Sequence, residues 1–390
     1  MRIMKHIGIY LAVEQNGGGT YQYNLSVIHA LRDLDKNEYK LTAFFHNQDL
    51  IKHLSGDFSI VFKKKSIVRR FFNKLYRMID RTPEASRRFA SFFNPIINEI
   101  NKSDCDIVIF PSQDQVSYQS NKKSLSTIHD LMHRYEGHFE EYQNGEYDLR
   151  EKHYSLMCKY ADGILVDSKV GKQQVIESYD IDEKNVFVLP FVPPFYLLDA
   201  KDIDIKSKYN LPDKYFFYPA QFWEHKNHLN LLNAVKILKD KDIEINLVLV
   251  GSKKNNYSKV TKKINELELN SNVYILGFVS NDDMASLYKN AIATTFVSLI
   301  GPTNIPPLEA MILGSPLICS NAYAMPEQVG DAALLIDPMN ANDIAEKMQK
   351  IIDDDVLAKT CVQKGKKIIE LYGQKEFSMK LELYIKSYLS

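Results

Sequence analysis

The stretch "NVYILGFVSNDDMASLYKNAIATTFVS", residues 272–298, contains two short apolar runs separated by a polar spacer of helical length. The runs are "NVYILG" (272–277) and "AIATTFVS" (291–298). Continuous apolar strands joined through helices are typical of parallel sheets that are covered on both faces. The stretch therefore predicts a strand–helix–strand unit of an α/β fold.

The same alternation extends in both directions along the chain. Further strands of this series are predicted at 215–220, 245–251, 315–320 and 332–337. An earlier series is predicted at 6–13, 39–45, 106–111, 125–130, 163–168 and 185–190. Prolines and charges interrupt the pattern at 191–215. We therefore expect an α/β protein with two Rossmann-like domains, 1–195 and 196–372, facing each other across a cleft, with ligand at the carboxyl ends of the strands.

Composition excludes several classes of function. The 390 residues include 49 Lys+Arg and 49 Asp+Glu, so overall charge gives no argument for binding nucleic acid, and we expect no nucleic-acid partner. The four cysteines are far apart and form no CxxC pair, which indicates reduced cytosolic thiols and no zinc or disulfide framework. No apolar run approaches the roughly 20 residues of a membrane span. A cytoplasmic location is expected.

One segment, residues 63–88, is strongly basic. It holds ten Lys or Arg side chains against Asp80 and Glu84, so its net charge is ten minus two, or +8. Apolar residues recur through it at helical spacing. This pattern suits an interfacial helix on an anionic membrane, at the inner face of the cell membrane, but a helix that packs its apolar stripe on its own domain has the same pattern.

Two motifs follow the first predicted strand of each series. In "NGGGTYQYN" (16–24), the glycines permit close backbone approach to a charged ligand at a helix N-terminus, although a tight connection needs glycines too. In "QFWEHKNHLNLL" (221–232), Lys226 stands at a helix start, where N–H groups and the helix dipole already favour an anion. The alternative is an exposed lysine beside an Asn227 helix cap.

Two further motifs supply a carboxylate and a histidine. In "GPTNIPPLEAMILGSP" (301–316), the two prolines fit a helix start and Gly314 its end, which places Glu309 in the first turn. A carboxylate there suits the hydroxyls of a ribose, or merely stabilises its own helix. His129 and Asp130 lie at a strand end in "TIHDLMH" (127–133). A lone histidine is more often structural, but four strand-end motifs converging on one cleft favour function.

The order of these motifs resembles that of the retaining family 4 glycosyltransferases, which have the GT-B fold. The resemblance covers nearly the whole chain. It is carried by "IHDL", "ADGILVDS", "HKN", "LVG", "LGFVSNDDMASLYKNA", "IPPLEAMILGSPLI" and "PEQVGDAALLIDP".

The resemblance implies a role for each candidate residue. Glu309 matches the second glutamate of the E-x7-E motif, which binds the ribose of a nucleotide sugar. Lys226 matches the lysine that meets the donor diphosphate, and His129 matches the histidine over the donor sugar; these are the expected catalytic residues. The turn whose backbone receives the nucleobase is then Gly277, Phe278 and Val279. The loop near the diphosphate and the acceptor is Gly17, Gly18 and Gly19.

Two positions depart from the family pattern. Gly301 stands where the first glutamate of E-x7-E is expected, and Gln221 stands where an arginine commonly partners the lysine. In the family, backbone amides of this loop also contact the sugar, so Thr303, Asn304 and Ile305 are expected to hold the hexose without that glutamate. The resemblance therefore implies a variant donor site.

The resemblance also implies a mechanism and an architecture. Transfer would retain the anomeric configuration, with the leaving phosphate accepting the proton of the incoming hydroxyl and with no metal or cofactor. The strings "DCD" (104–106) and "DID" (202–204) are interpreted as chance aspartate pairs. The last helix, 373–390, would cross back to the first domain, so that its removal destabilises the pairing of the two halves.

The expected function is a hexosyltransferase that moves a sugar from a UDP or GDP sugar to a glycan or lipid-linked acceptor in bacterial surface polysaccharide, either O-antigen or capsule. Residues 63–88 motivate the lipid part of this hypothesis. One alternative is a GT-B sugar-nucleotide epimerase or a transferase with a soluble acceptor. Another is a non-catalytic partner of a related transferase, which the missing glutamate keeps open.

Overall fold

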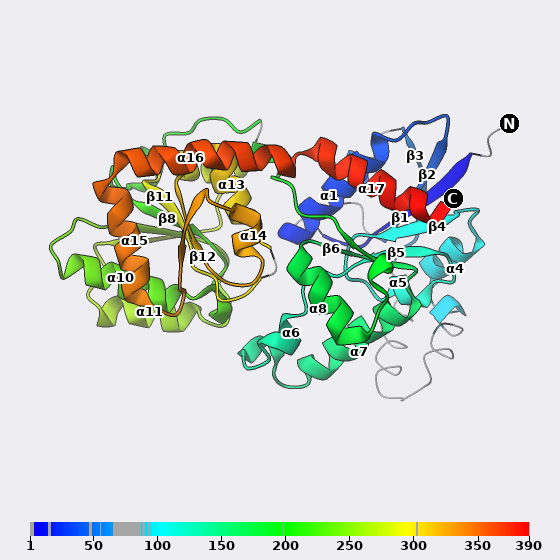
Figure 1. Ribbon diagram of the computed structural model, residues 1–390, viewed down its shortest axis with the longest axis horizontal. Helices are drawn as coiled ribbons and strands as arrows, with labels where there is room; N and C mark the ends of the chain where they lie inside the picture. Colours follow the sequence, from blue (N-terminus) through cyan, green and yellow to red (C-terminus); the bar gives the residue numbers. More distant parts are fainter. Residues whose placement is uncertain are drawn as a thin grey trace. The chain divides into compact units, whose positions relative to one another are not determined.

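The structure is a computed structural model, shown in Figure 1. It describes residues 4–14, 17–46, 49–54, 56–64, 87, 90–92, 94–197, 199–301 and 303–389. Most of the predicted basic helix, namely 65–86 and 88, lies outside these residues. The chain forms two compact units. The first contains Met1–Tyr135, Asn144–Pro190 and Gln374–Ser390, and the second contains Glu136–Gln143 and Phe191–Gly373.

Within the described residues, the first unit forms a seven-stranded parallel sheet in the order β3-β2-β1-β4-β5-β6-β7. Its strands are β1 (Lys5–Leu11), β2 (Tyr39–Phe45), β3 (Phe58–Phe62), β4 (Ile107–Phe110), β5 (Ser124–Thr127), β6 (Gly163–Val166) and β7 (Val186–Val188). Its helices are α1 (Gly19–Arg32), α4 (Pro95–Lys102), α5 (Val116–Gln119), α6 (Met132–Tyr135), α7 (Glu146–Tyr160), α8 (Lys169–Tyr179) and α17 (Gln374–Leu389), with short turns η1 (Ile51–His53) and η3 (Glu183–Asn185).

The second unit forms a six-stranded parallel sheet in its described part, in the order β10-β9-β8-β11-β12-β13. Its strands are β8 (Phe216–Pro219), β9 (Leu247–Val250), β10 (Val273–Gly277), β11 (Ala293–Phe296), β12 (Leu317–Ser320) and β13 (Ala333–Ile336). Its helices are α9 (Ile205–Tyr209), α10 (His228–Lys239), α11 (Tyr257–Glu266), α12 (Asn281–Asn290), α13 (Ile305–Leu313), α14 (Met325–Val329), α15 (Ala341–Asp353) and α16 (Asp355–Ile369), with short turns η2 (Glu140–Tyr142), η4 (Phe195–Leu197), η5 (Glu224–Lys226) and η6 (Glu370–Tyr372).

These sheets confirm the predicted α/β fold and each predicted strand, but the sequence analysis missed β3. This strand is at the sheet edge, and Ile60 and Phe62 are exposed while Phe58 is buried. Strands β1, β4, β8 and β9 are buried along almost their whole length, because parallel strands are covered by helices on both faces. Long apolar runs therefore revealed the central strands, whereas the half-exposed edge strand lacked that signal.

The order of strands locates one crevice in each sheet. In the first sheet the order reverses between β1 and β4, and in the second it reverses between β8 and β11. At each of these points the connections from the two neighbouring strands run in opposite directions, so the loops after the strands diverge. Ligands of open α/β sheets bind where these loops diverge. The loops after β1 and β8 carry the two motifs singled out in the sequence, 16–24 and 221–232.

Helix α17 completes the first unit. In Figure 1 it runs along α1, and Phe377 meets the Tyr23 ring edge-on at 5.7 Å between centroids. Its far end is fixed by two tyrosine hydroxyls, because Tyr384 donates to the carbonyl of Val188 at 2.9 Å and Tyr388 donates to that of Asp162 at 2.7 Å. The chain thus returns to the first unit after Gly373.

Candidate functional site

The loops after β8 and β11 bring a lysine and an asparagine together. Lys226 ends the short turn η5, and its Nζ donates to Asn304 Oδ1 at 3.2 Å and to Ser298 Oγ at 3.4 Å. The ammonium group also lies 5.4 Å from the centre of the Phe296 ring. Lys226 is partly buried, so the alternative of an exposed lysine is wrong.

Asn227, which follows Lys226, connects this turn to two other loops of the second unit. It adopts a left-handed conformation with φ of 61°, as asparagine tolerates better than most residues. Its amide does not cap α10; instead Nδ2 donates to the carbonyls of Val297, at 3.1 Å, and Pro338, at 2.6 Å. The start of α10 is thereby tied to the loop after β11.

Gln328 holds Asn304 in place through two backbone hydrogen bonds. The Asn304 N–H donates to Gln328 Oε1 at 3.1 Å, and Gln328 Nε2 donates to the Asn304 carbonyl at 2.7 Å. Gln328 is buried, with an exposed fraction of 1%. Because a lysine can only donate, the bond from Lys226 fixes the Asn304 amide with Nδ2 on the opposite side. That Nδ2 is shielded from solvent and has no hydrogen-bond partner among the described residues.

Gly301 has a structural reason to be glycine. Its φ is 130°, where side chains are strongly disfavoured, and a Cβ built there would lie 2.4 Å from Asn304 Nδ2. The position expected for the first glutamate of the motif is therefore already occupied by the Asn304 amide. Of its neighbours, Thr303 is buried and Ile305 begins α13.

Glu309 does not lie where the sequence analysis placed it. Because α13 begins at Ile305, Glu309 is its fifth residue, in the second turn, and the first turn contains no acidic residue. The alternative of a carboxylate that stabilises its own helix start therefore fails as well. The helix does end at Gly314, with φ of 74°, as predicted.

Two tyrosines bind the Glu309 carboxylate. Tyr196 Oη donates to Oε1 at 2.5 Å, and Tyr288 Oη donates to Oε2 at 2.6 Å. Glu309 itself is 6% exposed. Burial raises the pKa of this carboxyl group above its ordinary value, whereas the two hydroxyls act in the opposite direction because they donate to the charged form.

The other predicted residues of the second unit lie at strand ends. Gly277 is the last residue of β10 and has φ of 72°, and the Phe278 ring that follows is 90% exposed, whereas Val279 is buried. Gln221 is exposed after β8, and its Oε1 accepts a hydrogen bond from Trp223 Nε1 at 3.0 Å. An exposed aromatic ring at a strand-end turn is suited to stacking on a planar ligand.

The remaining predicted residues belong to the first unit. Gly18 precedes α1 with φ of 56°, Gly19 begins that helix, and a Cβ at Gly17 would lie 2.5 Å from Val13 Cγ2. His129 follows β5 by two residues and is buried, with its ring 4.9 Å from that of Tyr23. Burial lowers the pKa of His129 to about 4, so its imidazole is neutral at pH 7.

The structure thus brings some of the predicted site residues together and adds residues that the sequence analysis did not name. Lys226 contacts Asn304, and Glu309 lies on the helix that Asn304 precedes, while Gly17, Gly18, Gly19 and His129 are described with the first unit. Sequence reasoning missed the roles of Gln328, Ser298 and Tyr196. For Tyr196 no local signal existed, because it precedes Glu309 by 113 positions. For Gln328 the string "PEQVGD" was visible, but its contact with Asn304 was not.

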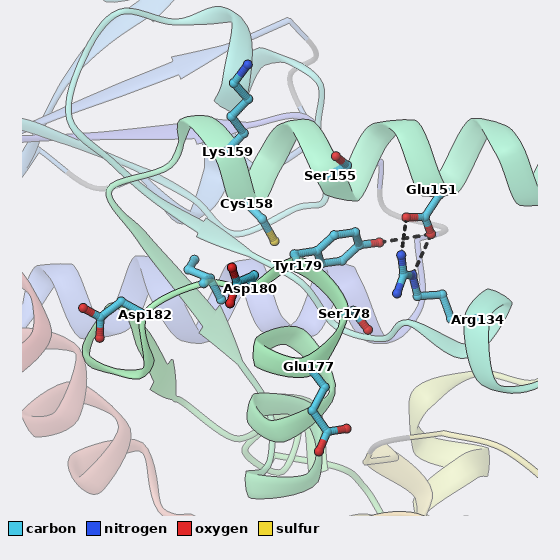
Figure 2. A pocket seen from close by; sticks show the side chains of 11 residues that line it. Arg134, Glu151, Ser155, Cys158, Lys159, Glu177, Ser178, Tyr179, Asp180 and Asp182 are labelled. Atoms are coloured by element: carbon cyan, nitrogen blue, oxygen red, sulfur yellow. Dashed lines mark hydrogen bonds and ion pairs between the residues drawn. The ribbon is translucent and has the colours of Figure 1, made fainter.

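A separate hollow of about 650 Å³ lies on the first unit between α7 and α8 (Figure 2). Arg134 donates there to both oxygens of Glu151, at 2.6 and 2.7 Å, and its guanidinium lies 4.7 Å from the Tyr179 ring centre. None of the predicted site residues lines this hollow. The Arg134 charge is already matched by Glu151, so we assign the hollow no role in the site.

Two other kinds of feature, a metal site and a membrane-spanning helix, are absent from the described residues. No group of three or more His, Cys, Asp or Glu side chains is arranged to hold a metal ion in that part of the chain. Nor does the described part contain a helix with the length and apolar character needed to cross a membrane.

Comparisons with known proteins identify sequence relatives. Residues 199–368 match the family model "Glycosyl transferases group 1". The serotype-specific mannosyltransferase WbdA of Escherichia coli is 28% identical over 222 residues, which are 54% of this chain and 27% of WbdA. The O-antigen chain mannosyltransferase RfbU of Salmonella typhimurium is 27% identical over 46% of this chain and 47% of RfbU. The matches therefore span from about a quarter to just under half of these relatives.

Solved structures share the fold over nearly the full chain. A glycosyltransferase from Rickettsia africae aligns with a TM-score of 0.73 and 20% identity, covering 100% of this chain and 99% of its own. HepE of Anabaena, solved with UDP and glucose, aligns with a TM-score of 0.73 and 13% identity, covering 98% of this chain and 100% of its own.

Proposed function

Because the chain belongs to the group 1 glycosyltransferases and has their GT-B fold, we propose that it transfers a hexose from a UDP or GDP sugar. The acceptor in this proposal is a glycan or a lipid-linked precursor of a bacterial surface polysaccharide, either O-antigen or capsule. The observation that carries this proposal is the pairing of Lys226 with Asn304 at the switch point of the second sheet, with Glu309 farther along the same helix. Relatives named as O-antigen mannosyltransferases support the hexose and the acceptor class.

In this proposal the second unit binds the donor. The diphosphate lies against Lys226 and the N-termini of α10 and α13, where N–H groups and the helix dipoles favour negative charge. The ribose hydroxyls donate to Glu309, and the base lies at the turn of Gly277, Phe278 and Val279. Asn304 and its neighbours Thr303 and Ile305 face the hexose.

Catalysis would be mainly electrostatic. Charge develops on the diphosphate as the bond from its oxygen to the anomeric carbon breaks, and Lys226 stabilises that charge without reorganisation. The acceptor hydroxyl attacks on the same face and gives its proton to the leaving phosphate oxygen, so the configuration is retained. His129, neutral at pH 7, adds no charge beside the sugar. This scheme assigns no step to a metal ion.

A second candidate is a non-catalytic partner of a related transferase, and Gly301 is the observation that favours it. The sugar-facing carboxylate of the motif is absent, and the Asn304 amide fills its place. Slow hydrolysis of the donor without acceptor would distinguish an enzyme from a scaffold. Peripheral contact of residues 63–88 with an anionic membrane remains a prediction from the sequence.

Thermal shift with UDP, GDP, ADP and CMP, and with their common sugar conjugates, tests the donor site. A ligand at 100 times its Kd stabilises the native state by about 2.7 kcal/mol, so one diphosphate series should raise the Tm clearly. Glu309→Ala should weaken that binding by roughly 1–3 kcal/mol because ribose hydroxyls lose their acceptor. Lys226→Ala should weaken it too and reduce turnover further.

Lys236→Ala is the matched control, because Lys236 lies on α10 and pairs with Asp240, away from the site. It should respond to the nucleotides as the parent does. Absence of any shift in the parent protein would contradict the proposal. A shift that survives Lys226→Ala and Glu309→Ala unchanged would show that the nucleotide binds elsewhere.

A further inference from the structure

The Glu309 carboxylate lies between two tyrosines that come from different elements of the second unit. Tyr196 belongs to η4, at the start of the long second-unit segment, and Tyr288 belongs to α12. Helix α12 packs against both η4 and α13. Tyr288 is fully buried and Tyr196 partly buried. Each hydroxyl donates to a different oxygen of Glu309, at 2.5 and 2.6 Å.

This arrangement fixes the carboxylate and leaves part of its capacity to accept hydrogen bonds unused. A carboxylate offers about four acceptor positions, and the two hydroxyls occupy one on each oxygen. Hydrogen bonds from neutral donors to a charged acceptor are short and stronger than bonds between neutral groups. Because the donors come from η4 and α12, the plane of the Glu309 carboxylate is held from two sides.

We propose that Tyr196 and Tyr288 are positioning residues that hold Glu309 ionised and oriented, so that its remaining acceptor positions receive the ribose hydroxyls of the donor nucleotide. This inference rests on the proposed function. It differs from a purely structural role, in which the hydroxyls would serve only to satisfy a buried carboxylate. The two roles differ in what happens to nucleotide binding and to its dependence on pH.

Of the groups around Glu309, the two tyrosine hydroxyls favour its ionised form. Burial raises the pKa of this carboxyl group, and the Tyr196 and Tyr288 hydroxyls oppose that rise. The elements packed on α13 are α12, α16, β11 and β12. No charged side chain of these elements is among the groups that shift the pKa of Glu309, within the part of the chain that the structure describes. Removing either hydroxyl should therefore raise the pKa further.

The test compares Tyr196→Phe and Tyr288→Phe with Tyr215→Phe. Tyr215 is a matched control, because it is buried and its hydroxyl donates to the carbonyl of Leu287 on α12, at 2.9 Å, rather than to Glu309. For each protein, the Tm is measured from pH 4 to 8 without ligand. The Kd for UDP and for GDP is measured over the same range by calorimetry.

Without ligand, the sign of the effect follows from linkage. An acid whose pKa is raised by folding is stabilising at low pH, and this stability is lost as pH rises through the folded pKa. The deficit of Tyr196→Phe and Tyr288→Phe relative to the parent should therefore be large at pH 7 and shrink towards pH 4. The deficit of Tyr215→Phe should be independent of pH.

With nucleotide, both site variants should bind roughly tenfold more weakly at pH 7, the loss of about one hydrogen bond to a charged group. Their affinity should begin to fall at a higher pH than that of the parent as the solution is acidified. Tyr215→Phe should bind as the parent does.

The outcomes test the positioning role and the proposed function separately. Binding by the parent together with unchanged affinity and unchanged pH profile in both site variants would overturn the positioning role alone. No binding of UDP or GDP by the parent would overturn the proposed function and the ribose role with it, while the pH-dependent loss of Tm would still report the contact with Glu309. Equal effects in all three variants would reduce the tyrosines to a structural role.

Discussion

At the scale of single residues, Gly301 stands where the family resemblance implies a glutamate, and the neutral amide of Asn304 lies against it. Gly301 leaves room for the Asn304 amide, which accepts from Lys226. An amide orients an ammonium group without carrying an opposite charge, which suits the proposed role of Lys226 beside a phosphate. The absent glutamate and the Asn304 side chain are thus two parts of one arrangement.

Gly301→Ala should destabilise the protein by roughly 1–3 kcal/mol, because its φ of 130° is nearly restricted to glycine and the new Cβ would meet Asn304 Nδ2. Urea denaturation measures this loss. Gly145→Ala is the control for conformation alone, since Gly145 has φ of 85° with no atom within 4 Å of an added Cβ. In an Asn304→Ala background the cost of Gly301→Ala should fall. Equal costs in both backgrounds would contradict the proposed contact.

At the scale of elements, helix α17 packs on the first unit through one apolar face. Phe377, Leu381 and Ile385 are buried, at the helical spacing of one stripe, whereas Leu383 is 63% exposed. The stripe lies against α1, and the tyrosine hydroxyls at the far end fix the helix to Asp162, just before β6, and to Val188, the last residue of β7.

Ile385→Ala should lower the free energy of unfolding by roughly 2–5 kcal/mol, because it removes buried methyl groups and leaves a cavity. Leu383→Ala, two residues earlier, should change it by less than about 0.5 kcal/mol. Denaturant unfolding of the two variants, followed by circular dichroism, makes the comparison. Similar losses for both would contradict the packing described for α17.

The same scale shows what sequence alone could and could not predict. The central strands were predictable because parallel strands buried on both faces are apolar along their whole length, and β3 was not because three of its five residues are exposed. Lys226 was predicted at a helix start and lies in the turn just before α10, whereas Glu309 was predicted in the first turn of its helix and lies in the second. The Tyr196 contact joins residues 113 positions apart, and the conformation of Gly301 depends on Asn304, so neither leaves a local pattern.

At the scale of the whole molecule, each unit buries a neutral histidine. Burial lowers the pKa of His129 in the first unit to about 4 and that of His228 in the second to about 3. Unfolding exposes both imidazoles, whose ordinary pKa is about 6.5, so the unfolded chain binds more protons below that pH. The stability that these two histidines contribute is therefore complete above pH 6.5 and is lost as pH falls from 6.5 towards 4.

Near pH 5, these two groups should lower the free energy of unfolding by roughly 2.7 kcal/mol per pH unit, since each bound proton contributes about 1.36. His228→Phe keeps the ring stacked on Phe222 and should reduce the measured slope by about 1.36 kcal/mol per pH unit, the share of one histidine. Urea denaturation at pH 5, 6 and 7 gives the slopes. An unaltered slope in His228→Phe would contradict the prediction.

The return of the chain to the first unit has a consequence for biosynthesis. A ribosome makes residues 191–373 before 374–389, so every strand of the second sheet has emerged while α1 still lacks the helix that packs on it. The first unit, whose synthesis begins first, is therefore completed last. During that interval the side of α1 that α17 covers is open to chaperones, and a chain that ended just before α17 would contain every described strand of the second unit but an incomplete first unit.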